Sequence, residues 1–464
     1  MTVLLWIWAC TGLALMLIGR QSRFASAGLP LAYFFELSLI HVPGAMIYAG
    51  SDSWAGNARL TLNGFEQTVI GMVSFLAAVI LARESDFAFN RQPPKRKMST
   101  SQLSGLSKLS VIYMIGGFCC FMFLGILSSL PSVGSITSAL GSLMIVGVGL
   151  RLWVTREAVS RASWFQTVAL LPFLPFVTMV KDGFFSFGTH WFLCCIGFLF
   201  NQSRRTRPAF ILLSPVVGFL ALSMFVNWMA IRGEYRQMVW LKQVDFSDRV
   251  ERIAQLYDKF EWLNFEDGRQ RVAIDGRLNQ NVLVGLAVER LESGAVEYAK
   301  GSVISDLLIA LIPRVIWPEK PAVGGGGDVV TRYTGFSFSE GTSVGAGQVF
   351  EFFINFGTPS VIVGFFLWGW LLAKMDVRII NCLNDGDQPG FLLWYLISLA
   401  MAQPSNNLKE IVVSVASAAV AAKGISYLCR RRFKELLSPA QSTYRDSTTG
   451  ASPSPSPELI QHRT

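Results

Sequence analysis

Residues 208–230, PAFILLSPVVGFLALSMFVNWMA, carry no charged side chain and are long enough to cross a bilayer as one helix. In the whole chain 52% of the residues are hydrophobic and 15% are charged, whereas soluble domains carry about 25% charged residues. The sequence therefore predicts an all-α polytopic integral membrane protein with about eleven transmembrane helices. The predicted spans are 2–19, 29–49, 62–82, 109–128, 134–150, 165–180, 183–200, 208–230, 355–373, 390–404 and 408–427.

Basic residues are concentrated in alternate connections between these spans. Arg204, Arg205 and Arg207 precede the eighth span, and the cluster 430–432 follows the last one. Because Arg and Lys are enriched in cytoplasmic connections, the pattern places the N-terminus outside and the C-terminus in the cytoplasm. A basic residue, Arg20, follows the first span and none precedes it, which is the reverse of a signal peptide. We therefore expect this helix to be retained.

One large connection, residues 231–354, is predicted to lie outside and to be partly helical. Apolar residues at helical spacing predict an amphipathic helix over 246–260, and a second helix is expected over 281–292. The apolar segment 302–317 contains Asp306 and a proline, so an interfacial or re-entrant helix is expected there. The glycine-rich run 324–327 predicts a mobile loop. The expected organisation is helices 1–8 in 1–230, the loop in 231–354, helices 9–11 in 355–428 and a disordered cytoplasmic tail in 429–464.

Several kinds of chemistry have no sequence motif in this chain. There is no GxxxxGK[ST] phosphate loop and no GxSxG nucleophile motif. The seven cysteines avoid the outside loop and form no zinc-binding pattern. Asp385 and Asp387 have the DxD spacing of some metal-dependent sugar transferases, but a polar helix connector is the favoured interpretation. From these absences we expect no metal and no cofactor. We also expect no nucleic-acid partner, because the positive charge has a topological explanation.

The outside loop carries the candidate site residues. Residues 312–321, IPRVIWPEKP, place an arginine, a tryptophan and a lysine beside an apolar segment, and a carboxylate follows at the next span. Guanidinium groups bind phosphate in a bidentate manner, and carboxylates can accept a proton from a hydroxyl. The alternative is that most of these arginines pair with neighbouring acidic residues. The predicted site comprises Glu351 and Glu340 as candidate bases and Arg277, Arg314, Arg232, Arg290, Trp317, Lys320 and Asn355 as substrate-binding residues.

The motif IPRVIWPEKP, a glycine-rich loop and then a Glu followed by Asn-Phe-Gly resembles the bacterial Wzy-type O-antigen and oligosaccharide repeat-unit polymerases. The resemblance covers mainly residues 270–370. It implies a glycosyltransferase of the bacterial inner membrane with its large loop and N-terminus in the periplasm. Such an enzyme polymerises undecaprenyl-pyrophosphate-linked repeat units into O-antigen or exopolysaccharide without a metal. By this resemblance Arg277 and Arg314 bind pyrophosphate and Glu351 or Glu340 is the base. The expected partners are the lipid-linked oligosaccharide, the bilayer and a protein that regulates chain length.

Two alternatives stay open at the level of sequence. An O-antigen ligase uses the same donor but transfers the glycan to a lipid-A-core acceptor. A flippase or transporter for the same lipid-linked glycan is expected to carry its charges within the spans, whereas here they are concentrated in the loop. Accumulated single repeat units in a deletion strain indicate a polymerase, and full-length chains left on the carrier indicate a ligase.

Overall fold

A computed structural model describes most of the chain, and all of its regular elements in the described part are helices. It describes residues 1–20, 26–49, 57–89, 98–124, 133–158, 160–202, 207–241, 245–312, 317, 319, 326–337 and 344–430. The elements are α1 (Thr2–Arg20), α2 (Leu29–Ile47), α3 (Ala58–Phe89), α4 (Thr100–Phe123), α5 (Val133–Glu157), α6 (Arg161–Leu170), η2 (Leu171–Phe173), α7 (Leu174–Asp182), α8 (Ser186–Gln202), α9 (Arg207–Leu241), α10 (Phe246–Asp258), α11 (Gly268–Asp275), α12 (Asn281–Glu292), α13 (Ser302–Leu311), α14 (Gly326–Thr334), α15 (Gly347–Phe356), α16 (Thr358–Asp385), α17 (Gln388–Met401) and α18 (Leu408–Leu428).

Among the described residues, eight helical segments are long and apolar enough to cross a membrane. They are α2, α3, α4, α5, the run from α6 to α7, α9, α16 and α18. The predicted first and tenth spans correspond to the shorter apolar helices α1 and α17, and the seventh corresponds to α8. The described part of the chain is thus that of a helical, polytopic membrane protein, and the count of eleven spans stays a prediction.

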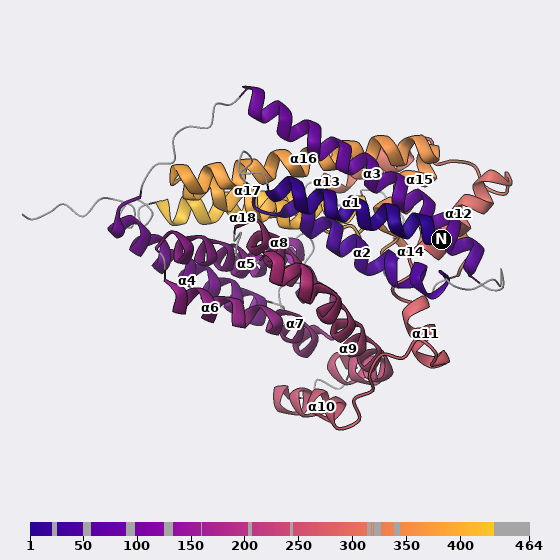
Figure 1. The fold of residues 1–464 in the computed structure, drawn as a ribbon, viewed down its shortest axis with the longest axis horizontal. Coiled ribbons are helices and arrows are strands. Elements are labelled where there is room, and N and C mark those ends of the chain that lie inside the picture. Colours follow the sequence, from indigo (N-terminus) through magenta and orange to yellow (C-terminus); the bar gives the residue numbers. More distant parts are fainter. Residues whose placement is uncertain are drawn as a thin grey trace, which may run out of the picture.

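The long helices form a bundle in which α3 lies along α16, α4 along α5 and α17 along α18 (Figure 1). Its interior is apolar and aromatic. The Tyr33 ring of α2 stacks on Phe75 of α3 with centroids 4.9 Å apart and meets the edge of Phe365 of α16. All three side chains are fully buried. Close-packed aromatic rings therefore join the three helices at the centre of the bundle.

Different elements lie at the two ends of the bundle. The N-terminus lies at the end where α11, α12 and α14 are found, whereas α18 finishes at the opposite end (Figure 1). The N-terminus and the helices α11, α12 and α14 thus lie at one end of the bundle, and the described C-terminal residues lie at the other. The placement of these two ends on the periplasmic and cytoplasmic sides stays a prediction.

Segment 231–354 contains the expected helices and several features that the sequence did not predict. The helix α10 occupies the predicted amphipathic segment, and α12 has the predicted bounds 281–292. The helix α13 ends at Leu311, and its ten residues are too short to cross a bilayer. Residues 231–241 continue α9 instead of entering a loop. Gly326 and Gly327, predicted as part of a mobile loop, begin α14.

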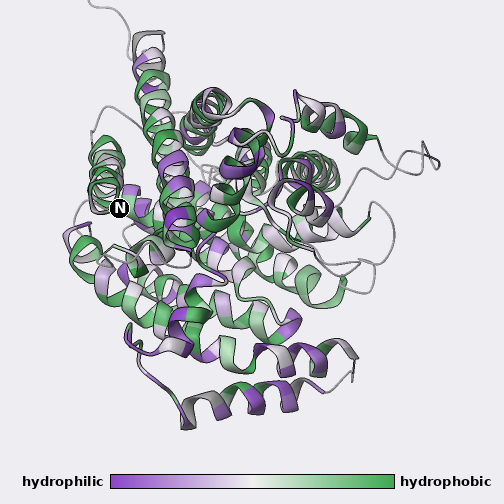
Figure 2. Ribbon diagram, turned by 90° about the vertical axis from the view of Figure 1, so that its right-hand side faces the viewer, coloured by the Kyte–Doolittle hydropathy of each residue, from purple (hydrophilic) through white to green (hydrophobic). Residues whose placement is uncertain are grey.

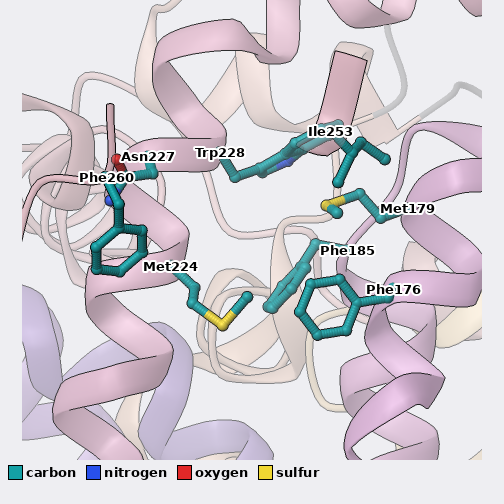
Figure 3. Close-up of a pocket in the computed structure, with 8 residues that line it drawn as sticks. All are labelled: Phe176, Met179, Phe185, Met224, Asn227, Trp228, Ile253 and Phe260. Atoms are coloured by element: carbon teal, nitrogen blue, oxygen red, sulfur yellow. The ribbon is translucent and has the colours of Figure 1, made fainter. Parts of the chain in front are cut away.

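The amphipathic helix α10 packs against α7 and α9. In Figure 2 it is the lowest helix and mixes hydrophilic and hydrophobic residues. Its Ile253 points toward an apolar pocket of about 20 Å³ formed by residues such as Phe176, Met179 and Trp228 (Figure 3). Asn227 of α9 fixes the chain after α10, because its amide donates to the Glu261 carbonyl and accepts from the Glu261 N–H. The second half of α9 is therefore held both by packing against α10 and by hydrogen bonds to the chain that follows α10.

Candidate functional site

A cavity of about 790 Å³ lies among α2, α8, α9 and the turn that joins α11 to α12. The segment before α18, including Gln403 and Asn406, forms part of its wall. Its volume falls within the range of about 300–1,000 Å³ that is typical of small-molecule sites. The wall combines aromatic and aliphatic side chains with a small number of polar ones, so it suits a ligand that is itself part apolar and part polar.

One face of α9 changes in character along the cavity. Ala221, Phe225 and Trp228 line it first, and Arg232 and Arg236 line it further along the same helix. These positions recur at three or four residues, which places them on one side of an α-helix. The distance from residue 221 to residue 236 along the axis is about 22 Å. The face therefore leads from an apolar region to a cationic one.

Arg232, Arg236 and Arg277 bring three positive charges to this cavity. The charges of Arg236 and Arg277 both act on Arg232, so the three guanidinium groups are close enough to repel one another. Arg236 is held by its Nε, which donates to the Gly183 carbonyl at 2.9 Å, and it lies over the Phe184 ring. Among the described residues, no carboxylate forms an ion pair with any of the three. Such a cluster favours an anionic ligand.

Arg269 of the same segment pairs with acidic residues, as the alternative interpretation expects. Arg269 is largely exposed and pairs with Asp267 at 3.0 Å and with Glu261 at 3.4 Å. Arg290 lies in the last turn of α12 beside Gly335 and is not part of the cavity wall. The structure therefore brings Arg232 and Arg277 together and leaves the predicted site residue Arg290 apart from them.

The turn that carries Arg277 is fixed by a network of neutral donors around Asp275. Its Oδ2 accepts from the Tyr48 hydroxyl at 3.0 Å and from the Asn57 amide at 2.9 Å, and its Oδ1 accepts from Asn279 at 2.6 Å. The Gln280 N–H also donates to the Ile40 carbonyl of α2. Asp275 therefore orients the turn through neutral donors, and among the described residues it forms no ion pair with Arg277.

Glu351 lies on the short helix α15 and is 5% exposed. Its Oε2 accepts a hydrogen bond from the Leu408 N–H, the first residue of α18. Burial raises the pKa of this carboxyl to about 7. Glu351 is not part of the cavity wall, and a carboxylate at a helix N-terminus has a capping role in its own right. Its role as a base stays a prediction.

The other predicted site residues are distributed as follows. Asn355 shares α15 with Glu351, and its amide donates to the Glu351 carbonyl at 2.7 Å and accepts from the Gly301 N–H at 3.1 Å. It therefore joins α15 to the start of α13. Trp317 is partly exposed. Three predicted site residues, Arg314, Lys320 and Glu340, lie outside the described residues.

Among the residues of the cavity wall that the predicted site does not include are Glu36, His190 and Arg236. A carboxylate in the middle of an apolar segment was the available signal for Glu36, because intramembrane charges are costly unless they are paired or functional. His41 and His190, the two histidines within predicted spans, have separate partners. His41 bonds to Asn281, whereas His190 bonds to Glu36.

Comparison of the chain with protein-family models, with curated proteins and with solved structures finds no match. The fold and the cavity define a polytopic helical membrane protein with a cationic, partly apolar site. Among the described residues, no group of three or more His, Cys, Asp or Glu side chains is placed to hold a metal ion.

Proposed function

We propose that the protein polymerises undecaprenyl-pyrophosphate-linked oligosaccharide repeat units on the periplasmic face of the bacterial inner membrane. The main support is the face of α9 that runs from apolar residues to Arg232 and Arg236, opposite Arg277. A polyprenyl pyrophosphate has the same two parts, a long apolar tail and a compact anionic head. The cavity therefore complements the shared chemistry of this class of donor.

The first half of α9 supports the same assignment. Val217, one turn before Ala221 on the same face, is exposed, and the most apolar stretch of α9 is less buried than that of any other long apolar helix in the described residues. In a bilayer this surface would contact lipid tails, so a polyprenyl chain could enter from the membrane and follow α9 to the arginines. The head group would then remain in the polar part of the cavity.

In the proposed reaction a sugar hydroxyl of one lipid-linked unit attacks the anomeric carbon of the growing glycan on another carrier. The bond between that carbon and the pyrophosphate oxygen breaks, and the pyrophosphate leaves with the electron pair. Arg232, Arg236 and Arg277 would stabilise the charge that develops on the leaving group. Arg314, which the resemblance implies to be a pyrophosphate-binding residue, would add a further positive charge to these three.

A glycan profile of a strain that lacks this protein tests the proposal against its two alternatives. Loss of a polymerase leaves single repeat units attached to the final acceptor. Loss of a ligase leaves full-length chains on the carrier, and loss of a flippase leaves single units on the carrier in the cytoplasmic leaflet. Either of the last two profiles would contradict polymerisation.

A further inference from the structure

Glu36 of α2 and His190 of α8 form a buried pair in the wall of the arginine-lined cavity. The distance between Glu36 Oε2 and His190 Nδ1 is 2.5 Å, and the two side chains are 10% and 4% exposed. The residues are far apart in the sequence, and their helices are in contact. Buried ionisable groups in a membrane protein are costly and usually serve a substrate, an ion or a proton.

The hydrogen bonds of His190 define where its protons lie. Its Nε2 is 3.0 Å from the Leu399 carbonyl of α17, and a carbonyl can only accept, so Nε2 carries a hydrogen. A further proton lies in the hydrogen bond between Nδ1 and Glu36 Oε2, and with this proton on Nδ1 the Glu36 side chain is a carboxylate. The imidazole therefore holds one oxygen of the carboxyl group in a fixed orientation, and α17 holds the imidazole.

The second carboxyl oxygen of Glu36 remains available to the cavity. Among the described residues, no donor bonds to Oε1, and Glu36 lines the cavity. The other two carboxylates of the wall differ from it. Asp275 accepts from three neutral donors, and Glu410 is partly exposed and accepts from Asn407. Glu36 is thus the carboxylate that is both buried and oriented with one oxygen open to a ligand.

We propose that Glu36 is the general base of the glycosyl transfer and that His190 is the residue that positions it. This inference rests on the proposed function. The acceptor hydroxyl gives its proton to Glu36 Oε1 as its oxygen bonds to the anomeric carbon of the donor. The bond from that carbon to the pyrophosphate breaks, and the pyrophosphate departs toward the arginines. Glu36 then releases the proton to water in the cavity.

The test uses the full-length protein in lipid nanodiscs with a purified lipid-linked repeat unit. Glu36→Gln keeps the shape of the side chain but cannot accept the proton, so kcat is expected to fall about 10²–10⁴-fold. The KM for the donor is expected to stay near the wild-type value, because the arginines are intact. Glu66→Gln is the matched control, since Glu66 is an exposed carboxylate on α3 and is expected to leave kcat unchanged.

Three further variants separate catalysis from folding. In Glu36→Ala, added formate is expected to restore extension in a concentration-dependent way, because a small carboxylate can occupy the space and accept the proton. His190→Asn, whose amide can replace the Nδ1 donor, is expected to retain more of kcat than His190→Ala at unchanged KM. A purely structural pair predicts neither the formate rescue nor this order.

The outcomes are distinguishable. A wild-type rate in Glu36→Gln overturns the assignment of the base and leaves the polymerase proposal standing. Loss of extension in Glu410→Gln with full activity in Glu36→Gln would move the base to Glu410. If the wild-type protein itself extends no glycan while it binds the donor, the proposed function and this inference both fail.

Discussion

Arg83 and Asp376 form an ion pair inside the bundle, with 3.0 Å between Nη2 and Oδ2 and side chains 4% and 0% exposed. Arg83 belongs to α3 and Asp376 to α16. The second oxygen, Asp376 Oδ1, accepts from the Leu29 N–H at the start of α2. One carboxylate thereby connects three helices, among them α2, which carries Glu36 into the cavity.

Removing one partner of this pair leaves a buried charge without compensation. Asp376→Ala is therefore expected to destabilise the protein by about 3–5 kcal/mol. Arg83→Met combined with Asp376→Leu is expected to recover most of this loss, since no charge then remains buried. Unfolding in detergent, followed by helical circular dichroism, measures both. If the free energy of unfolding of Asp376→Ala lies within about 1 kcal/mol of the wild-type value, the ion pair is solvated and weak.

Close packing between α3 and α12 supports the turn that carries Arg277. A Cβ on Gly285 of α12 would lie 2.0 Å from the Leu60 carbonyl oxygen of α3, a backbone atom that cannot move aside easily. Gly285→Ala is expected to cost about 1–3 kcal/mol or more. Gly116→Ala in α4 meets no atom within 4 Å and is expected to stabilise its helix by about 0.5–1 kcal/mol. Equal melting temperatures for the two variants would refute this packing argument.

The hydrophobic pattern predicted the helices well because each span depends on local composition. The same applies to α10 and α12, whose apolar periodicity is local. The break between α15 and α16 was not predicted. There Gly357 has φ 70° and ψ −152°, a conformation that glycine adopts readily, and it separates Glu351 from the spanning helix.

The cavity could be predicted only in part. Arg232 and Arg277 were chosen as ligands from their residue type and their position in the outside loop, and both line the cavity. The contact between Glu36 and His190 joins helices that are distant in the sequence, so no local spacing indicates it. The capping of α18 by Glu351 is also a tertiary contact, which residue types alone cannot reveal.

The burial of Glu351 can be tested by measuring how the stability of the protein depends on pH. Folding raises this pKa from its ordinary 4.5 to about 7, so the folded protein binds the proton more tightly than the unfolded chain. The resulting stabilisation is fully present below about pH 4.5 and is lost as the pH rises through about 7. It amounts to about 3 kcal/mol at most. The melting temperature is measured at several pH values across this range. Its dependence on pH is expected to be weaker in Glu351→Gln than in the wild-type protein. The same dependence in both proteins would show that the Glu351 carboxyl group is exposed to water.

Reporter fusions test the predicted orientation. A periplasmic reporter, alkaline phosphatase, is expected to be active when fused within 231–354 and inactive after residue 464, because basic residues favour the cytoplasmic side. A cytoplasmic reporter at the same sites serves as the control and is expected to give the reverse pattern. Alkaline phosphatase activity at the C-terminus would contradict an odd number of spans.

The most direct measurement is glycan extension by the purified protein in nanodiscs that contain a lipid-linked repeat unit. The wild-type protein is expected to produce longer glycans on the carrier. Arg277→Ala is expected to lower kcat/KM by about 10–100-fold, the equivalent of a charge-assisted contact of about 1.5–3 kcal/mol. Arg277→Lys is expected to restore kcat/KM only poorly. The control Arg269→Ala removes an exposed arginine that is paired at the surface, and its kcat/KM is expected to match that of the wild-type protein. Donor bound without any extension, or equal rates in the Arg277 and Arg269 variants, would contradict the account.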